Sequence, residues 1–431
     1  MNYSELASRM LKAADAMEGD TLKVVASGRE YQGILMPHHE FSDPDVLVLK
    51  MKSGYNVGVR LDGSSAVEVI SHAERKEKPA RRQKNESGLK TVAVIGTGGT
   101  IASYVDYRTG AVHPALSADD LLGAVPEISS ICNVKARVLF SIFSENMDVK
   151  AWVTLAQAVR EELDKGVDGV IIPHGTDTMG YTSAALSFML EGVERPVVLV
   201  GAQRSSDRPS SDAYTNLIAA GRFCVECAMP GVFVLMHETS SDTTAAVHLG
   251  TKVRKMHTSR RDAFASINSR PVARVHFNGA IEVLQNVAKE NREHYLKDNM
   301  EENVALLQFY PGMDPRTFLP LMKAHKGIVI AGSGLGHVSS SMVEAVREAT
   351  ASGTIVVMAS QCYYGRVNLN VYATGRDLIN AGAISAEDMI PETALVKLMW
   401  VLGQTDDRKK VEGMMTADLR GEIAERRDVD D

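Results

Sequence analysis

Cysteine is scarce in this chain. Four cysteines in 431 residues are too few for the disulfide framework that stabilises many secreted proteins. Cys224 and Cys227 form a C-x-x-C pair, but neither a second pair nor histidines at ligand spacing follow it, so no metal site is expected. We predict that these cysteines pack within a helix, because free cysteine is among the most buried residue types.

Long apolar runs are also missing. A membrane-spanning helix needs about 18 or more consecutive apolar residues, and the sequence has no such run. It also has no charged-then-apolar leader at its N-terminus. Together with the low cysteine content, this predicts a cytoplasmic protein that contacts no membrane.

The chain has no excess of positive charge. Its formal net charge is −7, whereas a surface that holds a duplex or a tRNA usually carries a basic field, because contacts with phosphates supply most of the affinity. Direct, extensive nucleic-acid contact is therefore not expected, although a partner chain could hold a nucleic acid. Apolar residues make up 45% of the sequence, which is enough for two or three domains with filled cores.

The first 75 residues contain short segments with strand character. After a short helix near residues 5–16, five apolar runs follow at intervals of about ten residues, separated by Gly, Pro, Asp and Ser. This spacing predicts a small β-barrel of SH3-like or OB-like size over residues 1–75, either a docking module or a packing scaffold. Residues 76–90 are polar and charged without apolar periodicity, which predicts a linker.

From residue 91 onward, apolar strands alternate with amphipathic helices. This alternation is typical of α/β folds with a parallel sheet. We predict one lobe over residues 91–298, which holds the active site, and a second lobe over residues 299–415. The highly charged residues 416–431 are expected to form a solvated helix or tail.

A glycine-rich turn follows the first of these strands, in the stretch TVAVIGTGGTIAS at residues 91–103. A dinucleotide fingerprint would need glycine at Ile101, and a phosphate-binding loop would need a lysine after the glycines. No nucleotide cofactor is therefore expected on this chain. The turn instead carries Thr100, and Thr176 with Asp177 follows another strand. Hydroxyls and carboxylates at strand ends are candidate site residues, although Thr100 and Asp177 could also be helix caps.

Two hexapeptides, TGGTIA at residues 97–102 and HGTDTM at residues 174–179, resemble the signature motifs of the asparaginase and glutaminase family. The resemblance runs from about residue 91 to about residue 405, and it includes the segments FSENMD, GAQR, AGSGLGH and MIPETALVKLMWVLGQ. It implies a two-lobed asparaginase-like α/β domain. The β-barrel, the linker and the segment GTKVRKMHTSRRDAF are similar to one branch of that family, the D subunits of archaeal-type glutamyl-tRNA(Gln) amidotransferases.

The resemblance implies acyl transfer through hydroxyl groups. Thr100 matches the nucleophile that attacks a side-chain carboxamide, while Thr176, Asp177 and Lys255 match a second catalytic group. Lys252 is the alternative to Lys255. A hydroxyl is a poor nucleophile at pH 7 unless a base or a cation helps to remove its proton, so an ammonium beside a carboxylate suits this role.

Other positions match the parts of the family's site that close over and bind the substrate. Tyr107 matches the tyrosine of a mobile loop, with Tyr104 as the alternative, and closure of this loop would exclude water. The residues that match substrate-binding positions are Gly99, Ser144, Glu145 and Gly175. His337 stands where free asparaginases have an asparagine that reaches a neighbouring subunit's site, so contacts between subunits are expected to differ.

The function implied by the resemblance is that of a glutaminase subunit. It would form at least a homodimer and pass ammonia to a synthetase-like E subunit, which binds Glu-tRNA(Gln) and uses ATP and Mg²⁺. Two alternatives remain: a free-standing L-asparaginase, and a docking or nucleic-acid-binding scaffold. The preference for glutamine or asparagine stays open, because the two differ by one methylene group.

Overall fold

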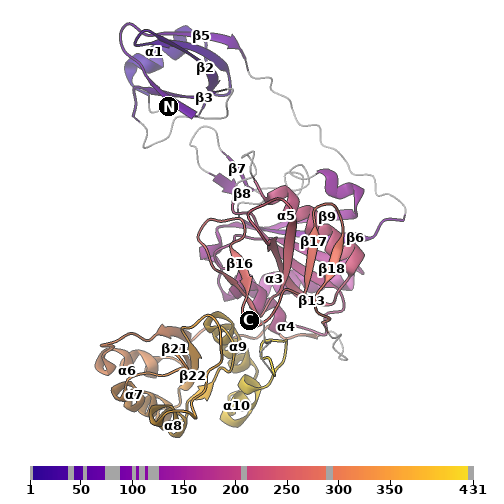
Figure 1. Cartoon of the computed structure of the whole chain (residues 1–431), viewed down its shortest axis with the longest axis vertical. Helices are drawn as coiled ribbons and strands as arrows, with labels where there is room; N and C mark the ends of the chain where they lie inside the picture. Colours follow the sequence, from indigo (N-terminus) through magenta and orange to yellow (C-terminus); the bar gives the residue numbers. More distant parts are fainter. Residues whose placement is uncertain are drawn as a thin grey trace. The chain divides into compact units, whose positions relative to one another are not determined.

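The computed structural model describes residues 3–36, 43–51, 56–72, 88–99, 103–105, 112–114, 126–204, 211–287 and 295–425. The chain divides into two units (Figure 1), one of residues 1–83 and 103–113, the other of residues 84–102 and 114–431. Within the described ranges, no helix combines the length and the apolar composition needed to cross a bilayer.

The described part of residues 1–83 forms one helix and a five-stranded antiparallel sheet. Helix α1 (Glu5–Ala13) is capped by the Ser4 hydroxyl, which accepts a hydrogen bond from the N–H of Ala7. The strands, in sheet order, are β4 (Asn56–Arg60), β3 (Val46–Met51), β2 (Arg29–Leu35), β1 (Thr21–Ala26) and β5 (Ala66–Ser71). Alternate residues of β1 are buried, as expected for a half-buried strand. The five antiparallel strands predicted from the spacing of apolar runs are thus confirmed.

The larger unit is built on an eight-stranded sheet. Its strands, in spatial order, are β18 (Ile281–Val283), β17 (Ala273–His276), β14 (Thr244–Leu249), β13 (Gly231–His237), β12 (Pro196–Val200), β10 (Gly169–Pro173), β6 (Thr91–Gly98) and β9 (Asn133–Ile142). The five strands from β13 to β9 are parallel, which confirms the predicted parallel sheet. The antiparallel extension by β14, β17 and β18 was not predicted.

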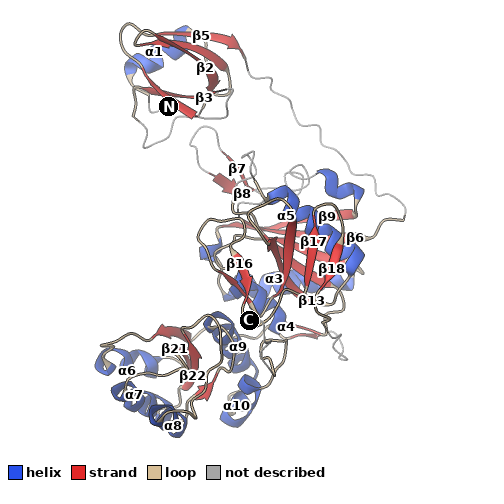
Figure 2. Cartoon of the chain, viewed as in Figure 1, coloured by secondary structure: helices blue, strands red, loops and turns tan. Residues whose placement is uncertain are grey.

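Helices cover both faces of this sheet (Figure 2). Residues of α3 (Val149–Asp164) and α4 (Met179–Met189) share one core with the sheet, and residues of α5 (Ala213–Arg222) share a second core on the opposite face. Every residue of β10 and β12 is consequently buried, as expected for parallel strands covered on both sides. The three helices fit the predicted alternation of strands and amphipathic helices.

The C-x-x-C pair lies in a π-helical turn, η4 (Phe223–Cys227), that continues α5. Cys224 is fully buried against Gly169, where an added Cβ would lie 2.9 Å from the cysteine Cβ. Burial raises the pKa of the Cys224 thiol. The packing role predicted for Cys224 is therefore confirmed. Among the residues that the structure describes, no three His, Cys, Asp or Glu side chains are grouped as a metal site requires.

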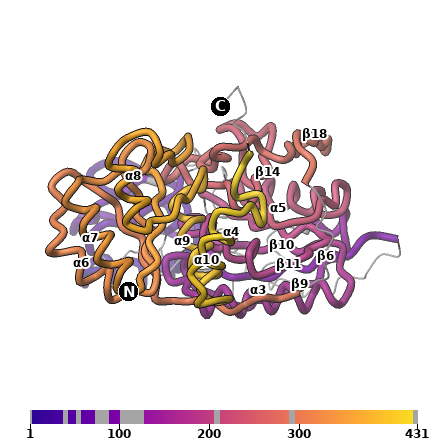
Figure 3. Tube along the Cα trace, turned by 90° about the horizontal axis from the view of Figure 1, so that it is seen from below, coloured from indigo at the N-terminus to yellow at the C-terminus, as the bar shows by residue number. Residues whose placement is uncertain are grey.

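The second lobe has a four-stranded parallel sheet. Its strands, in order, are β20 (Val304–Gln308), β21 (Gly327–Gly332), β22 (Ile355–Ser360) and β23 (Ile384–Ser385). Its helices are α6 (Pro315–Ala324), α7 (Ser340–Ala351), α8 (Ala373–Asn380), α9 (Pro391–Gln404) and α10 (Arg408–Thr416). Helix α9 lies beside α4 of the first lobe (Figure 3), and the Trp400 ring stacks on Phe188 with centroids 5.8 Å apart. One apolar core therefore runs through both lobes.

The charged C-terminal segment is partly or fully buried over residues 419–424, contrary to the solvated helix or tail predicted from its composition. Lys397 of α9 and Glu422 are both fully buried, with Nζ and Oε1 2.5 Å apart. Arg420 donates a hydrogen bond to the backbone carbonyl of Ser187 at 2.9 Å. Burial lowers the pKa of Lys397, and the Glu422 carboxylate opposes this effect. Composition could not reveal this pairing, because the opposite charge comes from a different element.

We expect Lys397→Met to lower the free energy of unfolding by about 3–5 kcal/mol, because the Glu422 carboxylate would stay buried without its partner. Urea unfolding at pH 7 measures this change. Lys323→Met is the matched control, because it removes an exposed ion pair with Glu348, and such pairs contribute little. Equal losses in the two variants would contradict a structural role for the buried pair.

Candidate active site

Three polar side chains meet at the carboxyl edge of the parallel strands in the first lobe. The Nζ atom of Lys255 lies 2.8 Å from Thr176 Oγ1 and 2.7 Å from Asp177 Oδ1. The side chain of Lys255 is 13% exposed, whereas that of Asp177 is 68% exposed. A sheltered ammonium thus bridges a hydroxyl and a carboxylate that faces solvent.

Two separate elements bring this cluster together. Thr176 and Asp177 lie between the end of β10 and the start of α4. Lys255 ends strand β15 (Val253–Lys255), which pairs with β16 (Phe264–Ser266) in an antiparallel hairpin. Lys252, the alternative left open by the sequence, does not join the cluster, because its buried Nζ lies 2.6 Å from Asp388 Oδ2 in the second lobe.

The direction of the hydrogen bonds in the cluster is fixed. An ammonium group only donates, so Thr176 Oγ1 and Asp177 Oδ1 accept from Lys255. Among the described residues, the Thr176 hydroxyl hydrogen has no acceptor. It is therefore available to a substrate or to a water molecule.

Glycines allow neighbouring strand ends to touch. Gly99 follows β6 with φ +84°, and a Cβ built on it would lie 2.7 Å from the Cα of Gly175. A Cβ built on Gly175 would lie 2.7 Å from the Ser144 Cβ. The structure therefore brings together three of the residues predicted to bind substrate: Gly99, Ser144 and Gly175. Their part in binding stays a prediction.

Ser144 and Glu145 lie in one short turn after β9, η3 (Ser144–Asn146). Ser144 is buried, and its backbone carbonyl accepts a hydrogen bond from Thr178 Oγ1 at 2.6 Å. Glu145 is exposed. The hydrogen bond ties the end of β9 to the residue that follows Thr176 and Asp177.

His174 supports the backbone just before Thr176. It is buried, and its Nδ1 lies 2.6 Å from the carbonyl oxygen of Gly175. Burial lowers the pKa of His174 to about 4, so the ring is neutral near pH 7. It therefore holds Gly175 in place without adding positive charge to the site.

Two predicted catalytic residues, Thr100 and Tyr107, lie outside the described residues. Tyr104, the alternative to Tyr107, belongs to β7 (Ser103–Val105), which pairs with β8 (Val112–Pro114). His337 packs edge-on against the Tyr372 ring, with centroids 5.3 Å apart. The roles assigned to Thr100, Tyr107 and His337 by the resemblance stay predictions.

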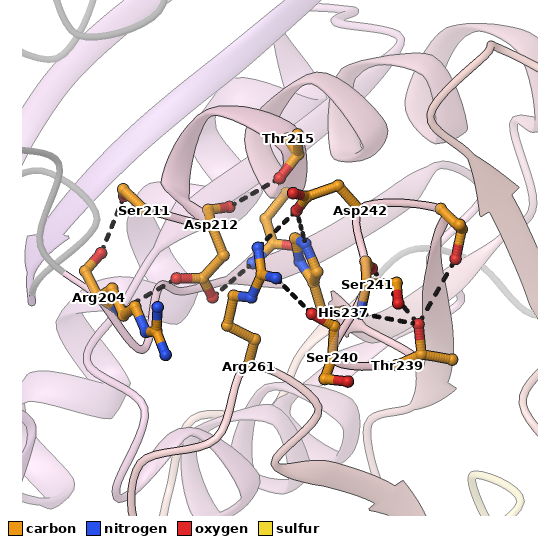
Figure 4. A network of polar contacts seen from close by, with 12 residues as sticks. Arg204, Ser211, Asp212, Thr215, His237, Thr239, Ser240, Ser241, Asp242 and Arg261 are labelled. Carbon is orange, nitrogen blue, oxygen red and sulfur yellow. Dashed lines mark hydrogen bonds and ion pairs between the residues drawn. The ribbon is translucent and has the colours of Figure 1, made fainter. Parts of the chain in front are cut away.

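A second polar network near these strand ends was missed by the sequence analysis (Figure 4). Asp212 at the start of α5 is fully buried and accepts hydrogen bonds from the backbone N–H groups of Gln203 and Arg204. His237, also fully buried, ends β13. A polar residue at the end of an apolar strand was the signal that drew attention to Thr176, and the same signal is present at His237.

Family models match three parts of the sequence. They are described as "Asparaginase, N-terminal" for residues 91–289, "Glutaminase/Asparaginase C-terminal domain" for residues 303–415 and "GatD N-terminal domain" for residues 16–70. The D subunit of the glutamyl-tRNA(Gln) amidotransferase of Pyrococcus furiosus is 52% identical over 91% of this chain and 91% of that protein. This chain belongs to the GatD family of amidotransferase D subunits. The corresponding protein of Saccharolobus solfataricus is 45% identical over 100% of this chain and 98% of that protein. As a GatD family member, the chain is an amidohydrolase component of an amidotransferase.

Solved asparaginases share the two-lobed fold of this GatD family member. The thermostable L-asparaginase from Thermococcus kodakarensis has a TM-score of 0.70 and 36% identity, and the match covers 78% of this chain and 99% of that chain. L-asparaginase I from Vibrio cholerae has a TM-score of 0.70 and 28% identity at the same coverage. The predicted asparaginase-like fold is thereby confirmed.

We expect Gly175→Ala to lower kcat/KM for amide hydrolysis by about 100-fold, because the new Cβ would push Ser144 away from the strand ends and shifts of about 1 Å are costly in active sites. Steady-state kinetics of the assembled enzyme measure this loss. Gly413→Ala in α10 is the control, since nothing lies within 4 Å of its added Cβ. Equal activity in both variants would show that the close approach is unimportant.

Acid should destabilise the fold through its buried histidines. Burial lowers the pKa of His174 and of His248 to about 4 from 6.5. Between these values the unfolded chain binds more protons than the folded chain, so stability is lost as pH falls from about 6.5 to about 4, by about 3 kcal/mol per histidine. Urea unfolding across this range should show the loss, and His248→Asn should reduce it. An unchanged pH dependence in the variant would contradict this origin.

Proposed function

We propose that this chain hydrolyses glutamine with Thr100 as the nucleophile and supplies ammonia to a partner subunit that converts Glu-tRNA(Gln) to Gln-tRNA(Gln). The observation that carries the proposal is the cluster of Lys255, Thr176 and Asp177. Gly175 precedes this cluster and contacts Gly99, and Thr100 is the next residue in the sequence. Relatives named as D subunits of glutamyl-tRNA(Gln) amidotransferases support the choice of reaction.

In the first half of the reaction, the Thr100 hydroxyl adds to the carboxamide carbon of glutamine. In this proposal the backbone N–H group of Gly175 stabilises the oxyanion, and such a donor contributes roughly 3 kcal/mol. The carbon–nitrogen bond then breaks. The proton released by the Thr100 hydroxyl passes to the departing nitrogen, which leaves as ammonia, and the glutamyl group stays bound to Thr100 as an ester.

In the second half, a water molecule adds to the ester carbon and glutamate leaves. Thr176 accepts a hydrogen bond from Lys255, and its own hydrogen has no acceptor among the described residues. In this proposal the hydroxyl therefore passes a proton between the reacting oxygen and the Lys255 side chain. Asp177 balances the charge of Lys255. This arrangement places a cation and a carboxylate beside the hydroxyl groups, and a hydroxyl nucleophile needs a neighbouring base or cation to lose its proton.

Other residues bind or enclose the substrate in this proposal. Ser144 and Glu145 hold the α-carboxylate and α-ammonium groups of glutamine. Tyr107 would match the family's loop tyrosine, and closure of such a loop would exclude water and strengthen the electrostatic interactions inside the site.

The partner subunit carries the chemistry for which this chain has no expected site. It would bind Glu-tRNA(Gln) and hold ATP and Mg²⁺, while this chain binds no cofactor and makes no extensive nucleic-acid contact. The chain itself would form at least a homodimer. A free-standing L-asparaginase is the alternative favoured by the structural likeness to asparaginases.

Amidase assays on the purified chain and on the assembled complex separate these functions. We expect glutamine hydrolysis to rise strongly when the partner subunit and Glu-tRNA(Gln) are added. Within the complex, Lys255→Met should lower kcat by about 10²–10⁴-fold, the usual contribution of a proton-transfer group. Thr100→Ala should abolish turnover.

Lys252→Met is the matched control for Lys255→Met. It removes the buried pair with Asp388, so it should lower the unfolding midpoint but leave the kcat of the folded enzyme nearly unchanged. Rapid asparagine hydrolysis by the chain alone would favour the free asparaginase. A Thr100→Ala variant that kept full biological activity would favour the scaffold alternative.

A further inference from the structure

The backbone of Gly201 packs against Thr176, and the buried side chain of Asn216 holds this backbone in place. A Cβ built on Gly201 would lie 2.8 Å from Thr176 Cγ2, so the backbone after β12 packs directly on the threonine methyl group. The carbonyl oxygen of Gly201 accepts a hydrogen bond from Asn216 Nδ2 at 3.0 Å. Asn216 is fully buried on α5. Its position therefore determines where the backbone behind Thr176 lies.

Asn216 is in turn oriented by His237. The Asn216 amide nitrogen faces two acceptors, the Gly201 carbonyl and Asp212 Oδ2, so its oxygen is the atom that faces His237 Nδ1 at 2.7 Å. Because that oxygen only accepts, the histidine Nδ1 carries the hydrogen. This arrangement fixes the orientation of the amide and places a hydrogen on Nδ1 of the ring.

The other ring nitrogen of His237 faces residues nearer the surface. His237 Nε2 lies 3.2 Å from Asp242 Oδ1, and the same oxygen lies 2.5 Å from Arg261 Nη1. Arg261 also donates to the backbone carbonyl of Ser240 (Figure 4). The guanidinium therefore holds the loop after β13 at two points, and its side chain is only 15% exposed.

Arg261 belongs to the hairpin that carries Lys255. The connection between β15 and β16 contains Arg261, and the ladder begins with the pair Lys255 and Phe264. A series of contacts thus connects Gly201, which packs on Thr176, with the hairpin that carries Lys255. Lys255 in turn donates a hydrogen bond to Thr176 at 2.8 Å, so the series of contacts begins and ends at Thr176.

We propose that Asn216, His237, Asp242 and Arg261 are positioning residues that set the distance between the Lys255 ammonium and the Thr176 hydroxyl. This inference rests on the proposed function, in which that pair moves a proton. None of the four residues needs to touch the substrate. Their effect follows from the sensitivity of proton transfer to geometry, since misplacement by about 1 Å can cost about 100-fold in rate.

Arg261→Met tests the surface end of the network, where the fold is least at risk. In the assembled complex with glutamine, we expect kcat to fall about tenfold or more with KM changed less than about twofold, because catalytic geometry is affected and substrate contacts are not. Arg261→Lys keeps the charge beside Asp242 and should restore part of the loss.

Arg260→Met is the matched control. It removes the same charge from the adjacent residue, but the Arg260 side chain is 59% exposed and, among the described residues, forms an ion pair only with Asp262 of its own loop. We expect wild-type kcat and KM. If Arg261→Met behaves like Arg260→Met while Lys255→Met is inactive, the positioning role is wrong and the proposed function stands. If Lys255→Met is fully active, the proposed function fails first.

A double-mutant cycle separates an effect on catalytic geometry from a general loss of stability. Asp242→Asn and Arg261→Met act on one contact, so their effects on kcat should be strongly non-additive. The unfolding midpoints of all variants are measured in parallel. Additive losses of kcat, or a loss that follows the unfolding midpoint alone, would overturn the proposal.

Discussion

The site depends on the contact between the backbones that follow two adjacent parallel strands. Gly99 approaches Gly175 so closely that it has no room for a Cβ, and Ser144 leaves no room for one on Gly175. Only glycine adopts the φ of +84° at Gly99 without strain. This contact brings the residue after β6 next to the loop after β10. All further groups, including Lys255, are arranged around that meeting point. A sheet with side chains at these two positions would separate its strand ends and disperse the same polar residues.

The fold, and two of the three residues in the cluster of Lys255, Thr176 and Asp177, could be predicted from local sequence pattern. Apolar strands alternating with amphipathic helices specify a parallel sheet, and its carboxyl edge identifies Thr176 and Asp177 as candidates. Lys255 could not be found this way, because it reaches the cluster from a hairpin 79 residues further along the chain than Thr176. Spacing alone gave no reason to choose it over Lys252. Strand register and side-chain direction decide between them, and both are tertiary properties.

Charge was the sequence feature that predicted solvent exposure least reliably. Charged segments are usually solvated, yet Glu422 lies in the core opposite Lys397, and Lys252 is buried against Asp388. In each pair the partners come from separate elements, so no window of sequence contains both. Burial of a charge is tolerated only where its partner is supplied. These pairs therefore fix which surfaces of the two lobes and the C-terminal segment can pack together.

The two lobes meet on the strand that carries the lysine of the site. Successive side chains of a strand point to opposite faces, and β15 follows this rule: Lys255 contacts Thr176, while Arg254 lies 3.0 Å from Glu392 and 4.6 Å from the centre of the Tyr363 ring. Glu392 and Tyr363 belong to the second lobe. Contacts with the second lobe therefore hold β15 on the side of the strand opposite Lys255. The second lobe thus helps to position Lys255, although it contributes no side chain to the cluster of Lys255, Thr176 and Asp177.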